Sequence, residues 1–198
     1  MIKTLLALDI DETLNSLLDH KLLCDADDDG RDEQLYPSDF EGVLKFCNIT
    51  NGGNCSEFNL GMYVNVEQLK AFNELREEFD ADVLGTSSWF CGGRDDRKVA
   101  GFLDIPDEKF IGSGDTGGSV GRCKSVAEAV LEGGYNRVIV LDDQYFGWEL
   151  FGLDAHRPPI TGAEGFNAEC QRIAREIQGI EIDHEKLRGL LEQYRTKR

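Results

Sequence analysis

Short apolar runs that end in polar residues recur along this chain of 198 residues. A mainly apolar run at 4–8 leads into Asp9, and the run at 138–141 leads into Asp142. A third run, at 81–84, is followed by Gly85 and Thr86, and a shorter one lies at 109–111. Continuous apolar runs of this length are typical of strands that are buried on both faces of a parallel sheet.

Apolar residues spaced three and four apart predict helices between and after these strands. The periodic positions are Val66, Leu69, Phe72, Leu75 and Phe79; then Phe166, Cys170, Ile173 and Ile177; and last Leu187, Leu190, Leu191 and Tyr194. Asn65 with Gln68, and Ser125 with Glu128, have the spacing of capping boxes, which predicts that helices begin there, and Asp183 is expected to cap the last helix. The helix that begins at Ser125 should end at Gly133, and a shorter helix is expected over 95–102. Alternating strands and helices predict an α/β fold with a Rossmann-like parallel sheet.

Residues 15–61 lack this periodicity and are rich in Asp, Gly, Asn and Cys. We interpret them as a small lid inserted after the first strand, and residues 1–14 and 62–198 as the core domain. A loop of this length without structure is unusual in a compact domain, so the lid should contain small elements of its own. Within it, the acidic stretch 25–29 is interpreted as a solvated turn, since a calcium loop would need Glu where Tyr36 stands.

Composition narrows the classes of partner and the compartment. The formal charge is −17, from 21 basic and 38 acidic residues, which disfavours binding to nucleic acid or to anionic membranes and favours a small substrate. No run approaches the roughly 20 apolar residues of a membrane span, and the N-terminal apolar run is shorter than that of a signal peptide. The six cysteines form no C-x-x-C pair, so we expect free thiols, with Cys47 and Cys55 as the one pair close in sequence. These features predict a cytoplasmic protein; they leave its oligomeric state open.

Acidic and hydroxyl side chains follow the predicted strands. Asp9 and Asp11 follow the first strand, Thr86 the second, and Asp142 with Asp143 the last. The carboxyl ends of parallel strands form the ligand-binding edge of such a sheet, so these side chains should converge. Four crowded carboxylates need a cation, and hard oxygen ligands suit Mg²⁺. Lys124, placed just before a predicted helix, would add a positive charge and backbone N–H groups for a phosphoryl group.

The run Asp9-Ile10-Asp11-Glu12-Thr13-Leu14 resembles the first motif, D-x-D-x-T-L, of the haloacid dehalogenase (HAD) superfamily. Thr86, Lys124 and the pair Asp142-Asp143 resemble its second, third and fourth motifs, in the same order. Glu12 stands where many members have Gly. Thr86-Ser87-Ser88-Trp89 also resembles, over a shorter stretch, a HAD subgroup associated with RNA repair.

This resemblance implies a phosphatase that requires Mg²⁺ and acts through an aspartyl-phosphate. Asp9 would be the nucleophile and a metal ligand, and Asp11 would protonate the leaving group, activate water and bind the metal through its carbonyl. Thr86 would hold phosphoryl oxygens and Lys124 would neutralise them. Asp142 would bind Mg²⁺, with Asp143 close to it.

Three alternatives to hydrolysis of a small phosphomonoester remain open. The substrate could be a phosphorylated nucleic-acid end or a phosphoprotein instead of a small molecule. Alternatively, the chain could be a catalytically silent binding domain on the same fold, because a fold does not guarantee an activity. Phosphotransfer to an acceptor other than water is a further alternative, since water access depends on the lid.

Overall fold

The fold is taken from a computed structural model, which describes residues 2–28, 40–47, 62–90, 96–114 and 118–196. Its centre is a sheet of four parallel strands in the order β5-β4-β1-β6. The strands are β1 (Thr4–Leu8), β4 (Asp82–Gly85), β5 (Phe110–Ser113) and β6 (Arg137–Leu141). Each was predicted from its apolar run, and the parallel pairing confirms the α/β class.

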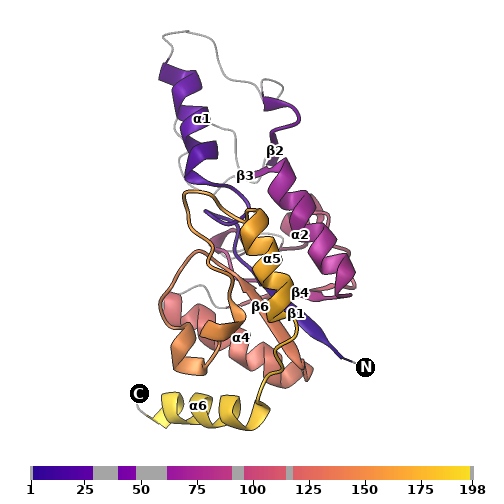
Figure 1. Ribbon diagram of the computed structural model, residues 1–198, viewed down its shortest axis with the longest axis vertical. Coiled ribbons are helices and arrows are strands. Elements are labelled where there is room, and N and C mark those ends of the chain that lie inside the picture. The colour runs from indigo at the N-terminus through magenta and orange to yellow at the C-terminus, as the bar shows by residue number, and fades with distance from the viewer. Residues whose placement is uncertain (1, 29–39, 48–61, 91–95, 115–117, 197–198) are drawn as a thin grey trace.

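Helices cover both faces of this sheet (Figure 1). One face packs against α2 (Val66–Glu78), α3 (Asp96–Phe102) and α5 (Ala168–Ile177), and the other against α4 (Ser119–Gly133). The last helix, α6 (His184–Thr196), packs against α4 and extends the second cluster. Leu6 and Leu8 of β1 point into the first cluster, and Leu5 and Ala7 point into the second. Burial on both faces explains why β1 is a continuous apolar run without alternation. Among the described residues, no helix is long and apolar enough to span a bilayer.

Most predicted helix ends are found in the structure. The Asn65 side chain caps α2 by accepting hydrogen bonds from the amides of Glu67 and Gln68. The reciprocal half of that capping box is absent, because the Gln68 side chain bonds to the backbone of residues 164 and 166 instead. The Asp183 carboxylate accepts from the amides of residues 185 and 186 and caps α6, as predicted.

The predicted start of α4 was wrong. The helix begins at Ser119, six residues before the Ser125 cap that the sequence suggested. The N-cap is Gly118, which has no side chain to accept a hydrogen bond, so the start carries no capping signal. Burial of Cys123, Val126 and Val130 against the sheet stabilises these turns in spite of their glycines. Lys124 therefore lies in the second turn of α4 and not before a helix.

The predicted lid contains elements of its own in the part that is described. These are α1 (Leu17–Asp28) and β2 (Leu44–Cys47), and β2 pairs antiparallel with β3 (Met62–Asn65) in a separate two-stranded sheet. Residues 25–28 are the end of α1, so the predicted turn is wrong there. The pairing of β2 with β3 crosses the predicted domain boundary at 61/62. Cys47 is a free thiol, and Cys55 lies outside the described residues.

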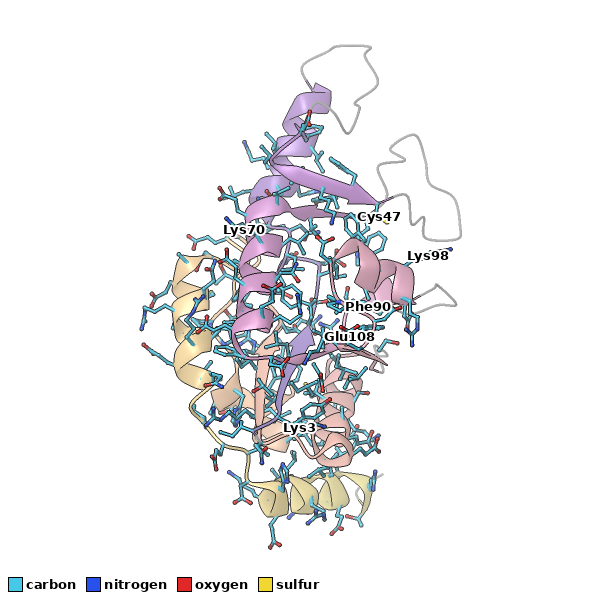
Figure 2. All side chains as sticks on the ribbon, turned by 90° about the vertical axis from the view of Figure 1, so that its right-hand side faces the viewer. Lys3, Cys47, Lys70, Phe90, Lys98 and Glu108 are labelled. Carbon is cyan, nitrogen blue, oxygen red and sulfur yellow. The ribbon has the colours of Figure 1, made fainter. Side chains whose placement is uncertain are left out.

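Figure 2 shows how these elements lie relative to the sheet. Lys3, at the amino end of β1, lies toward the end of the molecule that carries α6, whereas Cys47 on β2 lies toward the opposite end. The carboxyl ends of the parallel strands thus face α1 and the β2–β3 sheet.

Candidate functional site

The carboxyl ends of three neighbouring strands place acidic and hydroxyl side chains at one edge of the sheet. Asp9 follows β1, Thr86 follows β4 and Asp142 follows β6. The amide of Asp9 donates to the carbonyl of Leu141 at 2.8 Å, and the amide of Thr86 donates to that of Leu8 at 2.8 Å. These bonds continue the hydrogen-bond pattern of the sheet by one residue beyond the strands. The side chains of Asp9, Thr86 and Asp142 therefore follow adjacent strands at the same level of the sheet.

Three carboxylates meet at this edge. One oxygen from each of Asp9, Asp142 and Asp143 lies within 4.8 Å of the other two. Asp9 and Asp142 are 4% and 0% exposed, so water screens little of their mutual repulsion. A set of hard oxygen donors in this arrangement fits a divalent cation such as Mg²⁺.

Burial and mutual repulsion shift the acidities of these groups. Burial raises the pKa of Asp9 well above its usual range, the Asp142 charge raises it further, and Arg122 opposes both effects. Burial also raises the pKa of Asp142, again against the pull of Arg122. The pKa of Asp143 is raised by burial and then by the neighbouring Glu12. A bound cation would relieve the cost of keeping these groups ionised.

Arg122, which the sequence did not suggest, is the cation that contacts the carboxylates. Its Nη1 lies 2.7 Å from an Asp142 oxygen and 3.4 Å from an Asp9 oxygen. The side chain is almost fully buried, and its Nε–H has no hydrogen-bond partner among the described residues. The early start of α4 places Arg122 in the first turn of that helix, at the site.

Lys124 makes a different contact. Its ammonium lies 2.6 Å from Glu128 on the same helix, and Glu128 also accepts a hydrogen bond from Arg195 of α6 at 2.7 Å. Lys124 and Glu128 are four residues apart and so lie on one side of α4. In the part of the chain that is described, the site carboxylates contact Arg122 and not Lys124.

Thr86 supplies a hydroxyl that is buried without a partner. Its side chain is 0% exposed, and Oγ1 makes no hydrogen bond to any residue that the structure describes. Burying a hydroxyl in this state costs about 1–3 kcal/mol, so natural proteins keep few such groups. A ligand oxygen within hydrogen-bond distance would satisfy the hydroxyl, and a second one would satisfy the Nε–H of Arg122.

Asp11 lies apart from the three clustered carboxylates. It is exposed, and both of its carboxylate oxygens accept from the indole Nε1–H of Trp89, at 2.8 and 3.0 Å. Trp89 is half-buried and packs against the core, which fixes the donor. Trp89 therefore contacts both the core and the Asp11 carboxylate.

Glu12 adopts a φ of 58°, the left-handed region that glycine enters without cost. Here the Glu12 carboxyl hydrogen-bonds to Asp143 and packs against Gly162, where a larger residue would clash with it. The unusual residue thus adds a fourth carboxyl group beside the cluster.

No family model, curated protein or solved structure matches this chain. The chemical interpretation therefore depends on the geometry itself. The edge holds a divalent-cation donor set, a buried guanidinium, a hydroxyl without a partner, and a separate carboxylate that is open to solvent. A phosphoryl group needs these partners: a cation and hydrogen-bond donors for its oxygens, and an oxygen nucleophile.

Proposed function

We propose that this chain is a Mg²⁺-dependent phosphomonoester hydrolase of the HAD type that acts through an aspartyl-phosphate at Asp9. The observation that carries the proposal is the placement of two buried donors without partners, the Thr86 hydroxyl and the Arg122 Nε–H, beside three clustered carboxylates. Donors of this kind are costly to the free protein and suit an anion that arrives later. The motif order supports the same reaction class.

Asp9, Asp142 and Asp143 would hold the Mg²⁺ ion, together with the Asp11 carbonyl that the resemblance adds. The ion supplies charge neutralisation for the phosphoryl oxygens. Thr86 and Arg122 would orient those oxygens. In this account Arg122 takes the role that the motif order assigns to Lys124, because Arg122 contacts the nucleophile's carboxylate.

The reaction has two halves. A carboxylate oxygen of Asp9 forms a bond to phosphorus while the bond from phosphorus to the leaving oxygen breaks, and the Asp11 carboxyl gives that oxygen its proton. Water then attacks phosphorus, Asp11 takes the proton from water, and the bond to Asp9 breaks to release phosphate. Trp89 holds the Asp11 carboxylate through both steps.

Small phosphomonoesters are the favoured substrates, because the charge of −17 repels long polyanions. The test is phosphate release from an aryl phosphate, a panel of small phosphomonoesters, a phosphorylated oligonucleotide and a phosphopeptide, each with and without Mg²⁺. We expect Mg²⁺-dependent turnover of small esters that Asp9→Asn abolishes and Asp107→Asn, an exposed control, leaves intact. Turnover retained by Asp9→Asn would refute the mechanism. Absence of turnover in a folded protein that binds Mg²⁺ would favour the silent binding domain.

The choice between Arg122 and Lys124 as the positive side chain of the site is tested by a matched pair of substitutions on α4. We expect Arg122→Met to reduce turnover by orders of magnitude, because it removes the guanidinium beside Asp9. Lys124→Met breaks only the ion pair with Glu128 and should leave most of the activity. A larger loss of turnover in Lys124→Met than in Arg122→Met would instead assign to Lys124 the role of neutralising the phosphoryl oxygens.

A further inference from the structure

Arg157 bonds to the backbone of the loop that carries two of the clustered carboxylates. Its Nε–H donates to the carbonyl of Asp142 at 2.8 Å, and its Nη2–H donates to the carbonyl of Asp143 at 3.0 Å. The planar guanidinium offers donors in a fixed fork, so one side chain fixes two successive peptide groups. Arg157 comes from the segment after the short helix Asp154–His156, and no sequence motif pointed to it.

The guanidinium is held in turn by its surroundings. It lies over the ring of Tyr145, 4.1 Å from the ring centre, and the Tyr145 hydroxyl donates to the carbonyl of Ile160 at 3.2 Å. His156 and Pro158, on either side of Arg157, are buried. The loop after β6 and the segment 157–160 therefore form one connected unit, with Arg157 at its centre.

This loop sets the direction of the clustered carboxylates. β6 ends at Leu141, so the carbonyls of Asp142 and Asp143 lie beyond the last strand residue. The Asp142 carboxylate is oriented by the amide of Gln144 at 2.8 Å and by Arg122, and both contacts depend on the path of the loop backbone. Without Arg157 the two carbonyls would lose these donors, and the loop could rotate its carboxylates away from Asp9.

We propose that Arg157 is a positioning residue for the cation site: it fixes the Asp142-Asp143 loop so that both carboxylates face Asp9. The inference rests on the metal site of the proposed function, but on contacts that the motif resemblance does not include. It assigns to a residue outside all four motifs a role in metal affinity.

The direction of the change in metal affinity on removal of Arg157 distinguishes a positioning role from a purely electrostatic one. Arg157 is a cation close to a cluster of acids, so a purely electrostatic role would make its removal strengthen the binding of another cation. A positioning role predicts that removal of Arg157 weakens the binding of the metal ion. Loss of residues that orient metal ligands commonly costs 10- to 100-fold in metal affinity.

The experiment measures Mn²⁺ binding by titration calorimetry and by the electron paramagnetic resonance of free Mn²⁺, since carboxylate sites for Mg²⁺ also take Mn²⁺. The variants are Arg157→Met, which keeps part of the side chain, and Arg157→Lys, which keeps the charge but loses the fork. Arg175→Met removes the same charge from an exposed pair with Glu78 and is the control. We expect Kd to rise about 10- to 100-fold in Arg157→Met, by less in Arg157→Lys, and not at all in Arg175→Met.

Unchanged or tighter Mn²⁺ binding in Arg157→Met and Arg157→Lys would overturn the inference. If Arg157→Met fails to fold, Arg157→Lys alone decides, with circular dichroism and the melting temperature of the metal-free protein as its check. Failure of the wild type to bind Mn²⁺ would overturn both this inference and the proposed metal site. Mn²⁺ binding without phosphatase activity would contradict the proposed function alone, and the Arg157 variants would still decide the positioning role.

Discussion

Replacing Asp9 by Asn should make the metal-free protein more stable while it abolishes turnover. Asp9 is 4% exposed, and burial together with the Asp142 charge raises its pKa well above the usual range. The ionised carboxylate is therefore a destabilising group at neutral pH. Asn has nearly the same shape and no charge, so the substitution removes this penalty without leaving a cavity.

The size of the gain can be worked out from the distances. With an effective dielectric constant of about 20, two carboxylate oxygens no more than 4.8 Å apart repel by at least roughly 3.5 kcal/mol, and a guanidinium 3.4 Å away attracts by roughly 5 kcal/mol. These contributions largely cancel, and the cost of burying the charge, several kcal/mol, exceeds what remains. We therefore expect a gain of about 2 kcal/mol, which corresponds to a rise in melting temperature of about 4–8 °C for a chain of this size.

The gain should depend on pH. The penalty is fully present above the raised pKa of folded Asp9 and shrinks as the pH falls below that pKa. It disappears below the ordinary pKa of 3.8, where the carboxyl is protonated in both the folded and the unfolded state. Thermal melts followed by circular dichroism with a chelator at pH 8 and pH 4.5 would measure this, with Asp107→Asn as the exposed control. An Asp9→Asn protein that melts below the wild type at pH 8, or whose advantage is the same at both pH values, would show that the ionised Asp9 carboxylate does not destabilise the metal-free protein.

Three further predictions concern single side chains of the site and its surroundings. Thr86→Val should lower turnover about 10- to 100-fold without loss of melting temperature, because a hydrogen bond to a charged group contributes about 1.5–3 kcal/mol and Thr86 has no partner in the free protein. Trp89→Phe should lower kcat about tenfold and change KM less, since it removes the donor to Asp11 but keeps the packing; an unchanged kcat in steady-state assays would contradict this. Cys123, whose pKa burial raises to about 12, should resist alkylation at pH 8 until the protein is unfolded, and rapid labelling of its peptide by mass spectrometry would contradict that prediction.

The sequence predicted β1 and β6 well because these two central strands are buried on both faces. Residues such as Leu6 and Val140 lie in runs that need no alternation, and these runs marked β1 and β6 with little error. The polar residues after those strands, Asp9 and Asp142, followed directly from the rule for parallel sheets. That part of the site depends on backbone topology, which local sequence patterns determine.

Prediction failed where a local signal and tertiary packing disagree. Ser125 and Glu128 have capping-box spacing, yet Glu128 pairs with Lys124 inside α4, and the true start has only glycine as its cap. This error of six residues hid Arg122. By contrast, α1 had a readable signal that was missed: Ser16 and Asp19 bond reciprocally, the arrangement of a capping box that opens a helix. Arg157 had no signal at all, because its partners are backbone carbonyls 14 and 15 residues away.

Trapping the phosphoenzyme would show whether Asp9 carries the phosphoryl group during turnover. The protein is mixed with substrate and Mg²⁺, quenched in acid and digested, and the peptide that contains Asp9 is examined by mass spectrometry. The account predicts one added phosphoryl group on Asp9, lost on treatment with hydroxylamine and absent from Asp9→Asn. Rapid turnover with no phosphoryl group on that peptide, or with the group on another residue, would contradict it.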